Sequence, residues 1–231
     1  MLIKLEFLGH SGFLISDGKY RVVIDPFLSQ NPLAKKKPED IKCDWIVLTH
    51  GHFDHSCDAE VIAKRNGATI HAIYELADFF HEKGCQVRRA NQGGRVKTEF
   101  GSVTLVQAFH SSSIEGRYAG MPCGVILKIG GVTLYHCGDT SLFGDMALIG
   151  EMYRPHIAMI PIGDRYTMGP RMASKAAELI RPKIAIPIHY KTFPDELVNN
   201  SDEFQPKGIE VRVMEPGDTL IYPDLKLICT G

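Results

Sequence analysis

Thr49-His50-Gly51-His52-Phe53-Asp54-His55 follows directly after an apolar run, Trp45-Ile46-Val47-Leu48. The apolar run predicts a short buried strand, and the residues after His55 predict a helix. Three imidazoles and one carboxylate therefore fall at the carboxyl end of a strand, where α/β proteins usually place their sites. Imidazole suits zinc, iron, nickel or copper, and an added carboxylate oxygen suits harder ions such as manganese. We expect a metal site here rather than a His-rich surface turn.

The composition is that of an ordinary globular protein. The chain has 231 residues, of which 44% are hydrophobic and 23% charged, and a formal net charge of −1. This charge provides no general attraction for nucleic acid, so we expect a small-molecule substrate instead. The basic run Lys35-Lys36-Lys37 lies between two prolines and predicts a solvated loop. A homo-oligomer is compatible with these features.

The N-terminus predicts a strand rather than a targeting segment. Met1-Leu2-Ile3-Lys4-Leu5-Glu6-Phe7 alternates in polarity and has no apolar core or cleavage site of a signal peptide. No apolar stretch approaches the roughly 20 residues of a membrane helix. The six cysteines are scattered without a C-x-x-C pair, which favours reduced thiols. We therefore expect a cytoplasmic protein without a membrane segment.

The rest of the chain alternates predicted strands and helices. Strand-rich segments open both halves, and helices are expected near residues 57–66, 74–83, 142–151, 171–180 and 195–204. This order predicts an α/β protein with two β-sheets packed face to face and helices outside. Because no low-complexity linker divides the chain, we expect a single domain over residues 1–231, made of two similar halves.

Three further candidate ligands each follow a predicted strand: His110 after residues 103–109, Asp139 after residues 132–136, and His189 after residues 184–188. A lone histidine beside apolar residues is more often a hydrogen-bonded core or loop residue than a ligand. Their shared position at strand ends, together with the first motif, favours metal binding instead.

Seven ligands exceed what one ion normally takes from a protein while a position stays open for chemistry, so two ions fit the count. His50 and His52, which alternate along an extended loop, can face one ion. Asp54 and His55, at the helix start, can face the other. Asp139 can use both carboxylate oxygens to bridge the ions, and His110 and His189 would complete one ion each.

This arrangement resembles the five motifs of the metallo-β-lactamase superfamily over essentially the full length of the chain. Four segments look most like the small metal-dependent hydrolase branch of this superfamily, which is related to L-ascorbate-6-phosphate lactonase. They are Leu8-Gly9-His10-Ser11-Gly12-Phe13, Ile24-Asp25-Pro26-Phe27, His136-Cys137-Gly138-Asp139-Thr140 and Pro187-Ile188-His189-Tyr190. The resemblance implies a four-layer αββα sandwich of two mixed sheets with a dinuclear site on one edge. It also implies that His50, His52 and His110 hold the first ion, Asp54, His55 and His189 the second, and Asp139 both.

Several departures narrow the choice within that superfamily. Its true β-lactamases are exported and commonly use a cysteine on the second ion, whereas Asp139 stands at the expected ligand position here. Its thioesterases carry a helical region after the last histidine, and its nucleases carry RNA-binding segments. Only 42 residues follow His189. We therefore do not expect antibiotic hydrolysis, thioester hydrolysis or nuclease activity.

Two residues are candidates for catalytic roles. Asp54, beside the ions, can orient the attacking water and take its proton, although its position also suits a ligand or a helix cap. His10 lies in a glycine-flanked turn, where it can either approach the substrate and donate to a developing anion or serve only as a turn residue.

Other polar residues are candidates for supporting roles. Asp25 ends a strand before a proline, so we expect it to accept a hydrogen bond from a ligand imidazole. Asp164, Arg165 and Tyr190 are candidate substrate contacts, since a guanidinium can bind phosphate or carboxylate. An Asp164–Arg165 surface pair is the alternative.

The leading interpretation is a hydrolase in which a hydroxide between two divalent ions cleaves a phosphodiester, a lactone or another ester, including in phosphorylated substrates. Zinc is the expected metal, with manganese, nickel and iron as alternatives. A di-iron redox protein and a metal-stabilised module that binds nucleic acid or another ligand without turnover are the competing interpretations.

Overall fold

Alternation of apolar and polar residues forms the N-terminal strands. In β1 (Ile3–Gly9), Ile3 and Leu5 are buried while Lys4 is exposed. This strand pairs antiparallel with β2 (Gly12–Ser16), which in turn pairs with β3 (Arg21–Ile24). The three strands therefore present one apolar face to the interior.

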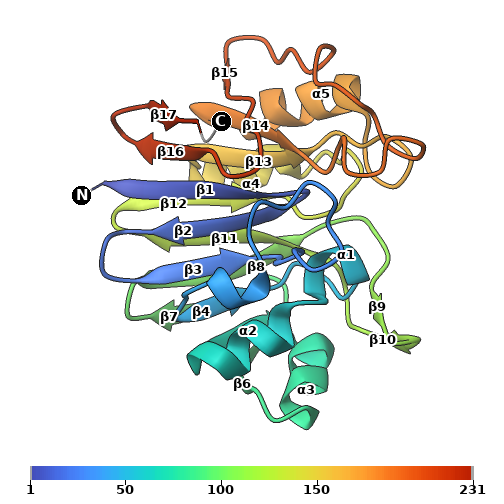
Figure 1. The fold of residues 1–231 in the computed structure, drawn as a ribbon. Coiled ribbons are helices and arrows are strands. Elements are labelled where there is room, and N and C mark those ends of the chain that lie inside the picture. Colours follow the sequence, from blue (N-terminus) through green and yellow to red (C-terminus); the bar gives the residue numbers. More distant parts are fainter. Residues whose placement is uncertain (1, 230–231) are drawn as a thin grey trace.

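The computed structural model describes residues 2–229, which form two mixed sheets packed face to face (Figure 1). The first sheet has the strand order β17-β16-β1-β2-β3-β4-β5-β6, and the second has the order β15-β14-β13-β12-β11-β8-β7. The remaining strands of the first sheet are β4 (Trp45–Val47), β5 (Thr69–Ile73), β6 (Gln86–Ala90), β16 (Thr219–Tyr222) and β17 (Lys226–Ile228). Those of the second are β7 (Arg95–Thr98), β8 (Gly101–Gln107), β11 (Cys123–Ile129), β12 (Val132–His136), β13 (Ile157–Pro161), β14 (Ile184–Ile188) and β15 (Glu210–Val211).

Helices lie on both sides of this pair of sheets, so the predicted αββα architecture is confirmed. They are α1 (Phe53–Ser56), α2 (Ala59–Asn66) and α3 (Tyr74–Glu82) beside the first sheet, and α4 (Met146–Tyr153) and α5 (Pro170–Ile180) beside the second. One buried cluster joins the facing sheets with α2 and α3, and another lies between the second sheet, α4 and α5. A two-stranded hairpin, β9 (Ser113–Ile114) and β10 (Arg117–Tyr118), projects from the body (Figure 1).

The prediction of a helix over residues 195–204 is wrong. The amides of Glu196 and Leu197 both donate to the carbonyl of Phe193, at 2.9 and 2.8 Å, which makes one turn only. The side-chain oxygen of Asn200 then accepts the amide of Asp202 at 3.1 Å. Such side-chain bonds to the backbone compete with helix formation, so the segment stays irregular.

The division of the sequence into halves does not coincide with the sheets. β16 and β17, near the C-terminus, return to the first sheet beside β1. A single domain of two similar halves stays a prediction.

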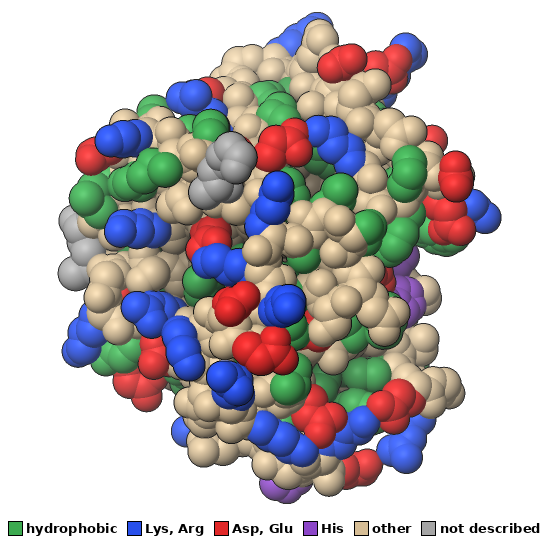
Figure 2. Space-filling model, viewed as in Figure 1, with side chains coloured by type: hydrophobic (Ala, Val, Ile, Leu, Met, Phe, Trp, Pro, Cys, Tyr) green, Lys and Arg blue, Asp and Glu red, His purple; other side chains and the backbone are tan. Residues whose placement is uncertain are grey.

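Among residues 2–229, no helix combines the length and the apolar character that crossing a bilayer requires. The six cysteines are free thiols. Basic and acidic side chains are interspersed over the face drawn in Figure 2, so this face presents no extended basic surface.

The parallel strands position the site. β3, β4 and β5 run parallel in the first sheet, and β12, β13 and β14 do so in the second. The carboxyl ends of parallel strands meet at one edge of a sheet. Asp25, the loop 48–52, Asp139 and His189 all follow such ends.

Candidate metal centre

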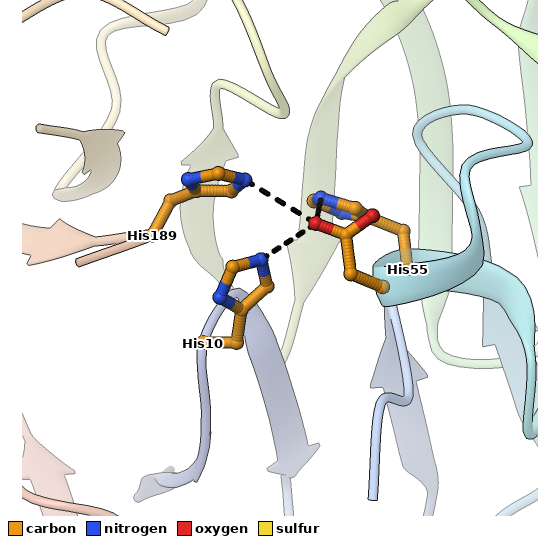
Figure 3. Close-up of side chains that lie close together, drawn as sticks. His10, His55 and His189 are labelled. Atoms are coloured by element: carbon orange, nitrogen blue, oxygen red, sulfur yellow. Dashed lines mark hydrogen bonds and ion pairs between the residues drawn. The ribbon is translucent and has the colours of Figure 1, made fainter. Parts of the chain in front are cut away.

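Loops at one edge of the two sheets bring the seven predicted ligands together. They come from four separate parts of the chain: the β4–α1 loop and α1, the residues after β8, those after β12, and the residue after β14. Figure 3 shows the rings of His10, His55 and His189 converging from different elements.

The first cluster consists of His50, His52 and His110, whose ligand atoms all lie within 4.8 Å of one another. Nε2 of His50 is 3.0 Å from Nδ1 of His52. His50 is buried, whereas the other two are half-buried. The three ligand nitrogens thus converge, and His52 and His110 line a cavity that leaves the cluster accessible.

The second cluster consists of Asp54, His55, His189 and His10. Oδ2 of Asp54 is 3.5 Å from Nε2 of His189 and 3.7 Å from Nε2 of His55. His10 lies together with these three expected ligands. The sequence predicted His10 near the substrate but not as a member of the metal cluster.

Asp139 lies between the two clusters. Its Oδ2 atom is 2.9 Å from Nε2 of His189 and 3.6 Å from Nε2 of His110, while its Oδ1 atom is 3.3 Å from Nε2 of His55. Nε2 of His50 is 4.0 Å from Oδ2. The carboxylate can therefore reach an ion in either cluster.

Unpartnered polar atoms show that these residues fit a metal. Nε2 of His55, Nε2 of His189 and Oδ1 of Asp139 are buried and lie at ion-pair distances from one another's side chains, yet none of them makes a well-aligned hydrogen bond within the described chain. Burial of polar atoms without partners is costly, and they face one another here. Divalent cations would satisfy all three.

Electrostatics lead to the same conclusion. Burial lowers the pKa of His189, but the carboxylates of Asp139 and Asp54 together outweigh it and raise that pKa to about 9. His55 behaves in the same way, with a pKa well above its usual value. Burial raises the pKa of Asp139 and of Asp54, yet His189 and His55 hold both carboxyl pKa values well below the usual range. Protons on histidines thus balance the carboxylates, a role that bound cations would take over.

Asp25 lies where the sequence predicted it. Its Oδ2 atom accepts a hydrogen bond from Nδ1 of His55 at 2.8 Å. Thr49, which sequence reasoning missed, donates its amide to Oδ1 at 2.8 Å and its hydroxyl to Oδ2 at 2.6 Å. The carboxylate is thereby fixed, and Nε2 of His55 is left to face the metal cluster.

His10 is buried rather than facing the open site. It is 1% exposed and adopts a left-handed backbone (φ 56°) in the irregular turn between β1 and β2. Its ring nitrogens lie 2.9 Å from Oδ2 of Asp54 and 2.9 Å from the hydroxyl of Thr192. Burial, and secondarily His189, lowers the pKa of His10 to about 4. The ring is therefore neutral near neutral pH, and its one N–H donates to Asp54.

A cavity of about 440 Å³ opens over the metal centre. Its lining adds a polar pair that the sequence did not reveal, because the hydroxyl of Tyr166 donates to Oε2 of Glu196 at 2.8 Å. Apart from this pair, the lining consists of His52, Phe53, Asp54, His110, Ser111, Asp139, His189, Phe193 and Leu197.

The three predicted substrate contacts do not line this cavity. Asp164 lines a different cavity beside Pro170. Arg165 is exposed, with a guanidinium nitrogen 3.9 Å from Glu196. Tyr190 is 5% exposed and packs in the cluster between the second sheet and its helices.

Comparisons with known proteins agree with this geometry. Residues 4–189 match the family model described as "Beta-lactamase superfamily domain". A UPF0173 metal-dependent hydrolase of Archaeoglobus fulgidus is 45% identical over 229 residues, covering 94% of this chain and 98% of the relative. One from Thermus thermophilus is 43% identical over 224 residues, with 95% and 99% covered. The solved structure of Igni18, a metallo hydrolase from Ignicoccus hospitalis, superposes with a TM-score of 0.87 at 38% identity and covers 96% of this chain and 99% of that one.

Proposed function

Since the chain belongs to the beta-lactamase superfamily, as one of its metal-dependent hydrolases, we propose that it holds two divalent ions and cleaves a lactone, another carboxylic ester or a phosphodiester. The observation that carries the two-ion proposal is the buried Asp139 carboxylate, which lies between one cluster of three histidines and another of Asp54, His55 and His189. Zinc is the proposed metal, with manganese, nickel and iron as alternatives.

Two divalent ions would supply a water activated near neutral pH and an electrophile for the substrate oxygen. The protein's own side chains would orient the attacking water and move protons. Asp54 lines the cavity and its side chain is 26% exposed, so its carboxylate can contact both an ion and the attacking water. Since its pKa is held low, it is ionised at neutral pH and can accept a hydrogen bond that orients that water.

The role of His10 follows from its contacts. Its Nε2–H donates to Asp54, and its Nδ1 accepts the hydroxyl proton of Thr192. Because the ring is buried, it acts on the reaction through Asp54 rather than by touching the substrate. We therefore assign His10 a positioning role in place of the catalytic role expected from the sequence.

The test is metal analysis combined with a substrate screen. Metal-free protein is refilled with zinc, manganese, nickel or iron and assayed with bis-p-nitrophenyl phosphate, p-nitrophenyl acetate and sugar lactones. We expect two equivalents of metal and metal-dependent hydrolysis, both of which His50→Ala lowers. His81→Ala, on the exposed face of α3, is the matched control and leaves both unchanged.

The outcomes separate the competing functions. Binding of a single equivalent would contradict the dinuclear site. Iron binding with a visible absorption band and no hydrolysis would favour a di-iron redox protein. Activity that survives in folded His50→Ala would place the hydrolysis elsewhere.

A further inference from the structure

A second cavity, of about 580 Å³, adjoins the cavity over the metal centre. His52, Phe53 and Asp54 line both cavities, so the two meet along this short segment. We call the second cavity the α3 groove, because its lining includes Phe79 and Phe80 of α3 and Lys83 directly after this helix. Ser113–Glu115 of the β9–β10 hairpin also line it.

The walls of the α3 groove are largely apolar. Phe53, Phe79, Phe80 and Ile114 all contribute to its lining, and Ile114 packs against the core cluster that contains Phe79 and Phe80. Phe53 stands where the two cavities meet and is 51% exposed, although it is a large aromatic residue. Its ring packs edge-on against Phe27 with centroids 5.8 Å apart, so the exposed ring is held in place. Apolar surface presented next to a reactive centre is typical of a ligand-binding groove.

Charges limit what the groove can bind. Among the residues that line the two cavities, Lys83 is the only Lys or Arg. Its Nζ atom lies 2.6 Å from Glu115 and 3.7 Å from Glu60, so two carboxylates already surround it. Glu196 adds a further carboxylate over the metal centre. An anionic arm lying in the α3 groove would thus find no basic side chain free of a carboxylate partner.

We propose that the substrate carries an uncharged, apolar acyl or aryl arm, which lies in the α3 groove while the scissile ester lies at the metal centre. The inference rests on the proposed function and narrows its substrate class. It favours hydrophobic esters and lactones over substrates whose arm ends in a phosphate or carboxylate.

Binding of alkyl hydroxamates to the zinc-loaded protein tests this proposal without turnover, because the hydroxamate chelates metal and leaves its alkyl chain free to enter the groove. Acetohydroxamate, butanohydroxamate and hexanohydroxamate are compared by calorimetry. We expect Kd to fall about fourfold for each methylene that becomes buried. Adipic acid monohydroxamate, which has six carbons and a terminal carboxylate, is expected to bind at least tenfold more weakly than hexanohydroxamate.

Variants locate the effect in the groove. Ile114→Trp fills the groove, so we expect the dependence on chain length to disappear while acetohydroxamate binds as before. Tyr118→Trp, on the same hairpin at a residue that is 68% exposed and outside the lining, is the matched control and should keep the dependence. Circular dichroism confirms that both variants are folded.

The results distinguish this inference from the proposed function. A Kd that is independent of chain length in the wild type, or a dependence that Ile114→Trp leaves intact, overturns the groove proposal even if acetohydroxamate binds in a metal-dependent way. Failure of acetohydroxamate to bind, with no zinc retained, overturns the proposed function, and the groove proposal with it.

Discussion

Nε2 of His10 lies 2.9 Å from Oδ2 of Asp54, although 44 residues separate them in sequence. The backbone carbonyl of His10 also accepts the amide of His189 at 2.8 Å. One turn between β1 and β2 therefore holds two residues of the second metal cluster, one through its ring and the other through its backbone. This turn links the first sheet to ligands from both sheets.

Thr192→Val tests the positioning role of His10. The substitution keeps the shape of the side chain but removes the hydroxyl that donates to Nδ1 of His10. The ring then loses the partner that fixes its tautomer, so we expect kcat to fall about tenfold with little change in KM or metal content. Stability should fall by about 1 kcal/mol. Steady-state kinetics, metal analysis and thermal unfolding measure these effects.

The control is Thr98→Val, which removes a buried hydroxyl that has no hydrogen-bond partner among the described residues. We expect kcat to remain unchanged there. A normal kcat in Thr192→Val would show that His10 is held in place without Thr192. Loss of one metal equivalent in this variant would show that the Thr192–His10 contact supports metal binding itself.

Asp139→Asn tests the link between the two clusters. The amide is nearly isosteric but is neutral and offers one oxygen, so it cannot balance two dications. We expect the protein to lose at least one of two zinc equivalents and most of its hydrolytic activity, at least 100-fold. Elemental analysis of dialysed protein gives the stoichiometry. Asp145→Asn, at a helix start where the side chain makes no capping hydrogen bond, should retain both equivalents.

The convergence of the candidate ligands was predictable because metal chemistry restricts them to few residue types and parallel strands bring their C-terminal ends together. His110, Asp139 and His189 follow predicted strands, and Asp25 follows a fourth. Local sequence thus predicts that these side chains lie close together, while their role as ligands stays a prediction. The extra contact of His10 was not predictable, because the Thr192 hydroxyl that orients its ring lies 182 residues away.

The walls of the cavities were not predictable for a related reason. Phe193 and Leu197 belong to an irregular segment whose path depends on distant backbone contacts. The amide of Val198 donates to the carbonyl of Gly163, and that of Lys191 donates to the carbonyl of Val198. No periodicity in the sequence records such contacts, and the pattern over residues 195–204 predicts a helix instead. This wall of the cavity therefore belongs to the part of the chain that the sequence pattern describes least.

Asp25→Asn tests how much the hydrogen bond from His55 to Asp25 contributes to zinc affinity. The amide keeps the size of the side chain but replaces a charged hydrogen bond to Nδ1 of His55 and disturbs the two bonds from Thr49. We expect zinc affinity to fall 10- to 100-fold, the usual effect of losing a hydrogen-bond partner of a metal-binding histidine. Competition with a chromophoric chelator measures it. Unchanged affinity would mean that packing alone orients the ring.

Metal removal and pH are linked through His189 and His55. In metal-free protein the pKa of His189 is raised from 6.5 to about 9, because Asp139 and Asp54 together outweigh burial, and the pKa of His55 is also raised. A group with a raised pKa stabilises the folded state fully below its unfolded pKa, and that contribution is lost as pH rises through the folded pKa. The shift of His189 alone should therefore lower the unfolding free energy of the metal-free protein by about 3 kcal/mol between pH 6.5 and 9, and the raised pKa of His55 acts in the same direction. In zinc-loaded protein the cations replace these protons, so the decrease should be much smaller. Denaturant unfolding of both forms across this range provides the measurement, and equal slopes would show that the two histidines do not bind the metal.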